Sequence, residues 1–108
     1  MDKRIAHYSL ETIKKLLRRS STREITRTSR RGAVSLGYMD DKAIVDVILT
    51  LDRKHLHKSM DTYGDHTLWQ DVYKVTVDEK KLYIKLQISP DSKKAVIVQF
   101  KEDDSQEV

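Results

Sequence analysis

The hydrophobic period changes along the chain, and this change restricts the fold more than any other feature of the sequence. Between residues 82 and 88 apolar side chains occupy every second position, and residues 96–100 repeat the pattern. Such alternation is typical of β-strands with one buried face. In residues 10–19 and 43–51 apolar side chains instead recur every three or four positions, as on one side of an α-helix. We therefore expect an α+β fold, with N-terminal helices covering one face of a small antiparallel sheet.

Capping residues, glycines and short apolar runs predict the individual elements. Ser9 is a suitable N-cap for the first helix, and Gly37 is a suitable C-terminal stop for the second, which contains Gly32. Asp40 and Asp52 are suitable N-caps for two further helices, although the β-branched residues of the third helix also allow a strand. The predicted elements are helices at 10–19, 27–36, 41–51 and 55–60, and strands at 23–26, 70–77, 81–88 and 95–101.

Length and composition fit one small intracellular domain. Residues 1–108 are expected to form a single domain, with an acidic tail that frays from about residue 103. The chain has no cysteine, which excludes disulfides, thiolate metal sites and a cysteine nucleophile. No apolar run approaches the roughly 18 residues that span a bilayer, and Met1–Arg4 does not lead into a secretory signal. We therefore expect a cytoplasmic protein with no membrane partner.

The net charge of +4 conceals a strongly basic N-terminal segment. Residues 1–31 carry ten Lys and Arg side chains against three acidic ones, a net charge of +7, whereas residues 32–108 sum to −3. A basic segment on an acidic body attracts a polyanion to one face, and nucleic acid is the polyanion we expect. Seven of the ten cations are arginine, which binds phosphate through two hydrogen bonds. The alternative is a solvated helix face without a ligand.

The alternation also predicts which side chains share the uncovered face of the sheet. If the apolar positions of 82–86 face the helices, Tyr83 and Lys85 point to the opposite, open face. By the same parity, the inward residues of the last strand are Val96, Val98 and Phe100. Lys101 then points outward and shares the open face with Tyr83.

Three polar residues from the middle of the chain are expected near this open face. Gln70 is an even number of residues from the polar positions Lys74 and Thr76 of its strand, so its side chain should point to the same face, near the edge of the open surface. His57 and Lys58, on the predicted helix at 55–60, could complete a rim. The result would be a concave, basic platform that bears a tyrosine.

This set of side chains suits the cleavage of RNA without a metal ion. His55 and His57 diverge on a helix and His66 lacks a paired ligand, so we predict no metal site. Metal-free cleavage needs a base for the ribose 2′-hydroxyl, an acid for the leaving oxygen, and cations for the charge that gathers on phosphorus. Lys, Tyr and His side chains can supply these groups. From the residues alone, however, plain RNA or protein binding is favoured over catalysis.

Several of these residues also have a purely structural interpretation. Tyr83 could serve only as a cross-strand packing residue. Trp69 and Tyr73 are expected to pack in or beside the core rather than to stack on bases. His57 and His66 could titrate near neutral pH, but we interpret both as structural histidines.

A specific run of residues in the middle of the chain adds a family resemblance. The seventeen residues from His57 to Tyr73 hold two histidines, two tyrosines, one lysine, one glutamine and the single tryptophan. With its flanking segments, this run resembles the motility quorum-sensing regulator family, whose members are small ribonuclease toxins of bacterial toxin–antitoxin pairs. The matching residues are Lys3-Arg4, His7, Ile13-Lys14-Lys15-Leu16, Lys58-Ser59-Met60, Thr62-Tyr63, Asp65-His66-Thr67, Trp69-Gln70-Asp71-Val72-Tyr73, Tyr83, Lys85 and Phe100-Lys101-Glu102.

The resemblance implies a fold, an activity and a partner. The implied fold is that of the RelE-like bacterial ribonuclease toxins, in which helices cover a small antiparallel sheet. The implied activity is ribosome-independent cleavage of mRNA at GC-containing triplets, chiefly GCU, with no cofactor. One alternative is a non-catalytic, basic nucleic-acid-binding module or transcriptional regulator. Another is a protein-interaction domain that uses a sheet edge.

The resemblance also implies which residues form the site. The catalytic or substrate-binding positions of the family match Lys58, Gln70, Tyr83 and Lys101. Lys58 and Lys101 would hold the scissile phosphate, and Tyr83 would take part in proton transfer. Gln70 would position the RNA, and the identity of the general base is left open.

The implied partner is a cognate antitoxin that binds through a zinc-containing N-terminal domain. The basic segment and the predicted strand at 23–26 offer both charge and unpaired backbone to such a partner. We therefore expect the antitoxin to dock beside residues 18–31, through an added strand and salt bridges that involve Arg23 and Arg27. The chain differs from the family in this Arg- and Ser-rich linker and in its acidic tail.

Overall fold

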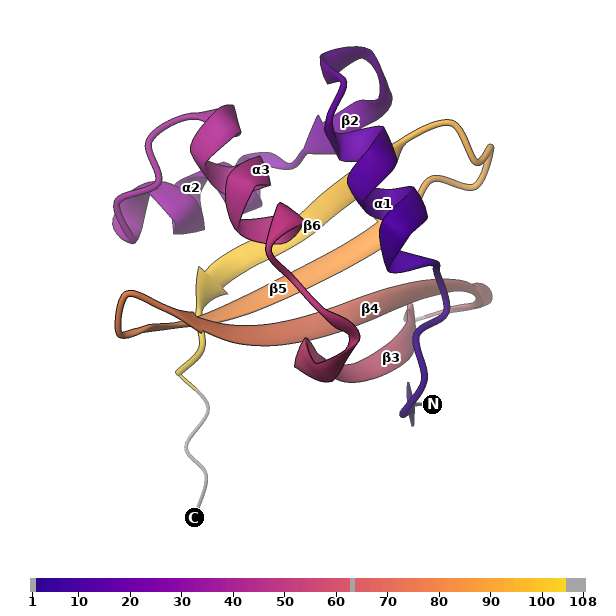
Figure 1. Cartoon of the computed structure of the whole chain (residues 1–108). Helices are drawn as coiled ribbons and strands as arrows, with labels where there is room; N and C mark the ends of the chain where they lie inside the picture. The colour runs from indigo at the N-terminus through magenta and orange to yellow at the C-terminus, as the bar shows by residue number, and fades with distance from the viewer. Residues whose placement is uncertain (1, 63, 105–108) are drawn as a thin grey trace.

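The structure, a computed structural model, describes residues 2–62 and 64–104 and shows a six-stranded sheet with helices on one face (Figure 1). In chain order, the elements are β1 (Asp2–Lys3), α1 (Leu10–Leu17), the 3₁₀ helix η1 (Ser20–Thr22), β2 (Arg23–Ile25), α2 (Arg27–Ser35), α3 (Asp41–Leu49), the 3₁₀ helix η2 (Arg53–His55), β3 (Leu56–Thr62), β4 (Asp65–Val77), β5 (Lys80–Ile88) and β6 (Ala95–Glu102). The predicted α+β fold is therefore confirmed. The arrangement is compatible with the RelE-like fold that the resemblance implies.

The strand order of the sheet is β1-β3-β4-β5-β6-β2. Strands β3 to β6 form an antiparallel meander, and β1 adds to β3 in the antiparallel sense. At the other edge β2 pairs with β6 in parallel, and this is the only parallel pair among the described strands. The predicted meander had three strands, so the structure adds one more at its start.

That additional strand corrects the prediction of a helix at 55–60. Asp52 does occupy the N-cap position, where its backbone N–H donates to Nδ1 of His55 at 2.9 Å, but the helix that begins there is only the short η2. The chain then extends into β3, which pairs with β4 on one side and with β1 on the other. The polar sequence of β3 gives little local preference for a strand, so the pairing with its neighbours decides its conformation.

Local capping explains where the three α-helices begin. Ser9 accepts a hydrogen bond from the backbone of Thr12 at 3.2 Å, and Asp40 accepts one from Ala43 at 2.8 Å, as predicted. Thr26, which we had not selected, caps α2 in the same way. The segment after Asp40 is a helix rather than a strand, because its apolar stripe packs on the core. Among the described residues, no helix is long and apolar enough to cross a membrane.

Gly32 lies inside α2 because that helix touches the sheet there. A Cβ atom at this position would collide with the backbone carbonyl of Phe100 on β6. The glycine, which weakened the sequence prediction of this helix, is therefore a requirement of close helix–strand packing.

The predicted alternation of inward and outward side chains in the last strand is correct only at the end of that strand. Lys85 pairs with Gln99 but Leu86 pairs with Ile97, so a bulge at Val98 shifts the alternation. Phe100 faces the core as predicted. The inward placement of Val96 and Val98 is wrong, and the residues that join the core in their place are Ala95 and Ile97.

The start of the acidic tail is attached to the sheet. The backbone N–H of Asp103 donates to the carbonyl of Lys81 at 2.7 Å, and its carboxylate lies 3.5 Å from the ammonium of Lys74. The predicted fraying from residue 103 is therefore wrong for this residue. Residues 105–108 of the predicted tail lie outside the described residues.

Candidate active site

In the part of the chain that the structure describes, all helices lie on one side of the sheet and leave its other face open (Figure 1). Two neighbouring cross-strand rows define its centre. In the first row Lys58 of β3 pairs with Val72 of β4, which pairs with Lys85 of β5. In the second row Lys74 of β4 pairs with Tyr83 of β5, which pairs with Lys101 of β6.

Val72 forms an apolar floor between two lysines of the first row. Its side chain is 0% exposed, yet it is not part of the core cluster beneath the helices. The neighbours on either side of it in the row are Lys58 and Lys85. Long lysine stems commonly cover apolar surface while the ammonium groups reach solvent. This arrangement places two cations beside one small, dry patch.

The ring of Tyr83 lies near the ammonium groups of two lysines. The ammonium of Lys101 lies 5.1 Å from the centre of the Tyr83 ring, and that of Lys85 lies 5.9 Å from it. Burial is the largest cause that raises the pKa of the Tyr83 phenol, and nearby Lys58 lowers it less. The phenol is therefore protonated at neutral pH and can donate a proton to a leaving oxygen.

Lys85 is the member of this cluster that we did not select from the sequence. Burial, followed by repulsion from Lys101 and Lys58, lowers the pKa of its ammonium. A bound phosphate would relieve this repulsion, so the cluster is suited to hold an anion. The alternation had placed Lys85 on the open face two residues after Tyr83, and this spacing was the signal that could have identified it.

Lys58 already contacts an anionic group. Its ammonium lies 3.1 Å from the carboxylate of Asp2, on the short strand β1 that pairs with β3. Both side chains are partly exposed, so the pair contributes at most about 1 kcal/mol. The Asp2 carboxylate shows that the Lys58 ammonium is positioned to bind an anionic oxygen.

Gln70 lies on the open face but at some distance from Tyr83. It belongs to β4, an interior strand of the sheet, and its amide donates to the Gln87 side chain at 2.9 Å. Gln70 is four positions before Lys74, the strand partner of Tyr83. That spacing corresponds to about 13 Å along a strand. The structure thus brings Lys58, Tyr83 and Lys101 together and leaves Gln70 beside the next part of the face.

The aromatic residues Trp69 and Tyr73 have structural roles, as we expected. The Trp69 ring stacks on the His7 ring at a centroid distance of 5.5 Å, and Tyr73 is a fully buried member of the core. Asp71, between them, accepts hydrogen bonds from the backbone N–H groups of His7 and Tyr8 at 3.0 and 2.9 Å. This contact holds the segment before α1 against the helix-covered side of the sheet.

The described part of the chain offers no cluster of acidic and histidine side chains. Across residues 2–62 and 64–104, no three His, Cys, Asp or Glu side chains are close enough together to hold a metal ion. His66 pairs with Asp61, and His55 belongs to the cap of η2. β3 itself carries one histidine, His57, which lies next to Lys58 in the chain.

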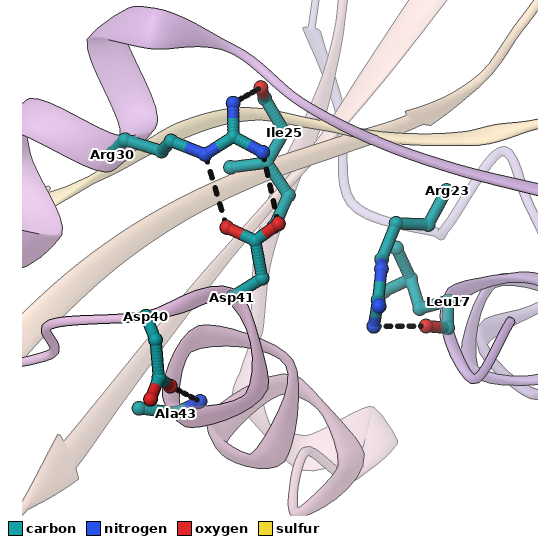
Figure 2. A network of polar contacts seen from close by, with 7 residues as sticks. All are labelled: Leu17, Arg23, Ile25, Arg30, Asp40, Asp41 and Ala43. Carbon is teal, nitrogen blue, oxygen red and sulfur yellow. Dashed lines mark hydrogen bonds and ion pairs between the residues drawn. The ribbon is translucent and has the colours of Figure 1, made fainter. Parts of the chain in front are cut away.

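Two arginines of the basic segment are tied to the fold. Figure 2 shows that Arg30 binds both carboxylate oxygens of Asp41, at 2.9 and 3.0 Å, and also donates to the carbonyl of Ile25. Arg23 donates to the carbonyl of Leu17, near the end of α1, at 3.1 Å. Arg27 and Arg31, on either side of Arg30 in α2, are also exposed.

Two comparisons with known proteins cover nearly the whole chain. The family described as "Motility quorum-sensing regulator, toxin of MqsA" matches residues 5–102. The chain is also 38% identical over 102 residues to the mRNA interferase toxin MqsR of Escherichia coli (strain K12), covering 94% of this chain and 99% of that protein. The match therefore includes β3, β5 and β6, the strands that carry Lys58, Tyr83 and Lys101. The chain belongs to the motility quorum-sensing regulator toxin family.

Proposed function

We propose that the open face is the active site of an mRNA-cleaving endoribonuclease toxin that works without a metal ion. The observation that carries this proposal is the convergence of Lys58, Lys85 and Lys101 around Tyr83. Membership of the toxin family and the similarity to an mRNA interferase support it. The substrate is mRNA free of the ribosome, cut in the cytoplasm at GC-containing triplets such as GCU.

The chemistry assigns a role to each residue. Lys58 and Lys101 hold the scissile phosphate and stabilise the negative charge that grows on it in the transition state. Tyr83 donates its phenolic proton to the departing 5′ oxygen. Gln70, about 13 Å along the strand, contacts a neighbouring nucleotide rather than the scissile phosphate. The four predicted residues therefore divide into a reacting centre and a positioning contact.

Incubation of the purified protein with labelled single-stranded RNA tests this function. One RNA carries a single GCU triplet, and a matched RNA has that triplet replaced. We expect cleavage of the first RNA alone, without ribosomes. Binding of both RNAs without cleavage would instead identify the alternative, a non-catalytic nucleic-acid-binding module.

We also propose that a cognate, zinc-containing antitoxin docks beside residues 18–31 and leaves the open face uncovered. Strand β2 is an edge of the sheet, which favours an added strand from a partner. The edge is short, however, and the carbonyl of Ile25 already accepts a hydrogen bond from Arg30. Salt bridges to the exposed Arg27 and Arg31 must then supply a large share of the recognition.

A further inference from the structure

A bulge in β3 places two consecutive side chains on the open face. Leu56 pairs with Tyr73 and packs against the core, whereas Lys58 pairs with Val72 on the opposite face. His57 is the extra residue between these two pairs. Consecutive side chains of a regular strand point to opposite faces, but the bulge directs both His57 and Lys58 away from the helices.

His57 differs from the other three histidines in its contacts. His7 is within hydrogen-bond distance of the Lys3 ammonium, His55 caps η2 and His66 pairs with Asp61. Within the described ranges 2–62 and 64–104, the ring nitrogens of His57 have no hydrogen-bond partner, whereas its backbone carbonyl accepts a hydrogen bond from Arg4 at 3.1 Å. A partly buried ring without a partner does not fit the structural role that we predicted for it.

The groups around His57 keep its ring neutral. Burial is the largest cause that lowers the pKa of its imidazole below 6.5, and three cations from three segments add to it. These cations are Lys74 on β4, Lys58 on β3 and Arg4 from the segment after β1, with Asp103 opposing them. A neutral imidazole with a free nitrogen can accept a proton at pH 7.

We propose that His57 is the general base that removes the proton from the ribose 2′-hydroxyl. The 2′ oxygen attacks phosphorus and forms the 2′,3′-cyclic phosphate while the bond from phosphorus to the 5′ oxygen breaks. The proton of the 2′-hydroxyl moves to His57, and the 5′ oxygen takes the phenolic proton of Tyr83. Proton exchange with water restores both groups. This inference rests on the proposed ribonuclease function.

The position of the two groups suits an in-line displacement. His57 is on β3 and Tyr83 is on β5, with only β4 between them. Two strand spacings correspond to about 10 Å between backbones. Side chains that lean together from such positions can reach opposite sides of one phosphate. Lys58, the next residue after His57, supplies the cation that holds the phosphate between them.

The first test is the pH dependence of cleavage by His57→Gln, with His66→Gln as the matched control. Because the neutral imidazole is the active form, the wild-type kcat/KM should fall as the pH drops through the lowered pKa of His57. His57→Gln should lose about 10²-fold or more in rate, and its kcat/KM should no longer show this fall at low pH, the acid limb of the pH profile. His66→Gln should retain both the rate and the limb. An unchanged acid limb in His57→Gln overturns the assignment.

The second test separates the base from the acid. In an RNA whose 5′ bridging oxygen is replaced by sulfur, the leaving thiolate needs no proton. Tyr83→Phe should therefore regain activity on this substrate, whereas His57→Gln should not.

Added imidazole should rescue His57→Ala, which a purely structural histidine would not allow. Recovery of His57→Gln on the sulfur substrate, or failure of imidazole to restore folded His57→Ala, would assign the base to another group. If the wild-type protein cleaves no RNA at all, the proposed function fails instead.

Discussion

Tyr83 and Lys101 are direct partners across the β5–β6 pair, with the Lys101 ammonium 5.1 Å from the centre of the tyrosine ring. The bulge of β6 lies at Val98, so the strand regains a regular register before it reaches this pair. In the mechanism that we propose, this pair joins the proton donor Tyr83 to a cation that holds the scissile phosphate. Substitution of either residue should therefore affect catalysis more than stability.

Single substitutions of the cluster should separate catalysis from folding. Lys58→Ala, Tyr83→Phe and Lys101→Ala should each lower cleavage by about 10²-fold or more, because each removes an electrostatic or proton-transfer group. Their melting temperatures should stay near that of the wild type, since none of the three is buried in the core. Rates measured on one labelled RNA, together with thermal melts, check both expectations.

Lys81 and Lys93 provide the matched controls for this series. Both are exposed, and Lys81 is on the same strand as Tyr83. Lys80 is unsuitable, because its ammonium donates to the carbonyl of Leu36 at 2.6 Å and therefore supports the fold. Lys81→Ala and Lys93→Ala should change the rate little. Equal, small losses in all five variants would indicate a binding surface in which only the total charge matters.

Cleavage should continue when a chelator is present, because the lysines, the tyrosine and the histidine of the open face supply every proton and charge that the reaction needs. The products should carry a 2′,3′-cyclic phosphate or a 3′-phosphate, and DNA should remain intact because it lacks the 2′-hydroxyl. Product ends can be identified by mass spectrometry. Loss of activity in EDTA, restored by Mg²⁺, contradicts this prediction.

Charge reversal on α2 should weaken neutralisation by the antitoxin without affecting the free toxin. Arg27→Glu and Arg31→Glu should slow association, because rim charges mainly set the on-rate. Arg23→Glu is a poorer probe, since Arg23 also donates to the carbonyl of Leu17. Association kinetics and cleavage assays on the same variants check this. If only Lys58→Ala and Lys101→Ala abolish binding, the antitoxin plugs the open face instead.

Gly32→Ala should destabilise the fold, although it replaces no side chain of the open face. The added methyl group would overlap the carbonyl of Phe100, so α2 must move away from β6. Overpacking of this kind costs about 1–3 kcal/mol, and the strain here is against rigid backbone. Denaturant unfolding measures the loss.

Asp2→Asn should strengthen RNA binding. The Asp2 carboxylate competes with phosphate for the Lys58 ammonium, which lies 3.1 Å away. Removing this charge should raise RNA affinity about threefold, the scale of one exposed ion pair, and the gain should shrink at high salt. The affinity is best measured in the Tyr83→Phe background, where RNA stays uncut. Weaker binding in Asp2→Asn would show that Asp2 positions Lys58 rather than competes for it.

Much of the fold follows from signals that are local in the sequence. The caps at Ser9 and Asp40 begin helices because each side chain binds a backbone N–H three residues away. The alternation of β5 sets one face against the core wherever the strand lies, so the outward direction of Tyr83 was predictable. The sequence by itself therefore determined the α+β class, the three helices and the direction of Tyr83.

Only the tertiary structure decided the form of β3 and the composition of the site. Leu56–Thr62 is a strand because β1 and β4 pair with it, and its own residues have no strong preference. The bulges at His57 and Val98 depend on how neighbouring strands align, which no periodicity within one strand reveals. The free ring of His57 and the crowded ammonium of Lys85 arise from contacts between residues far apart in the chain. Capping and alternation act within a few residues, whereas register and charge crowding exist only after distant strands have paired.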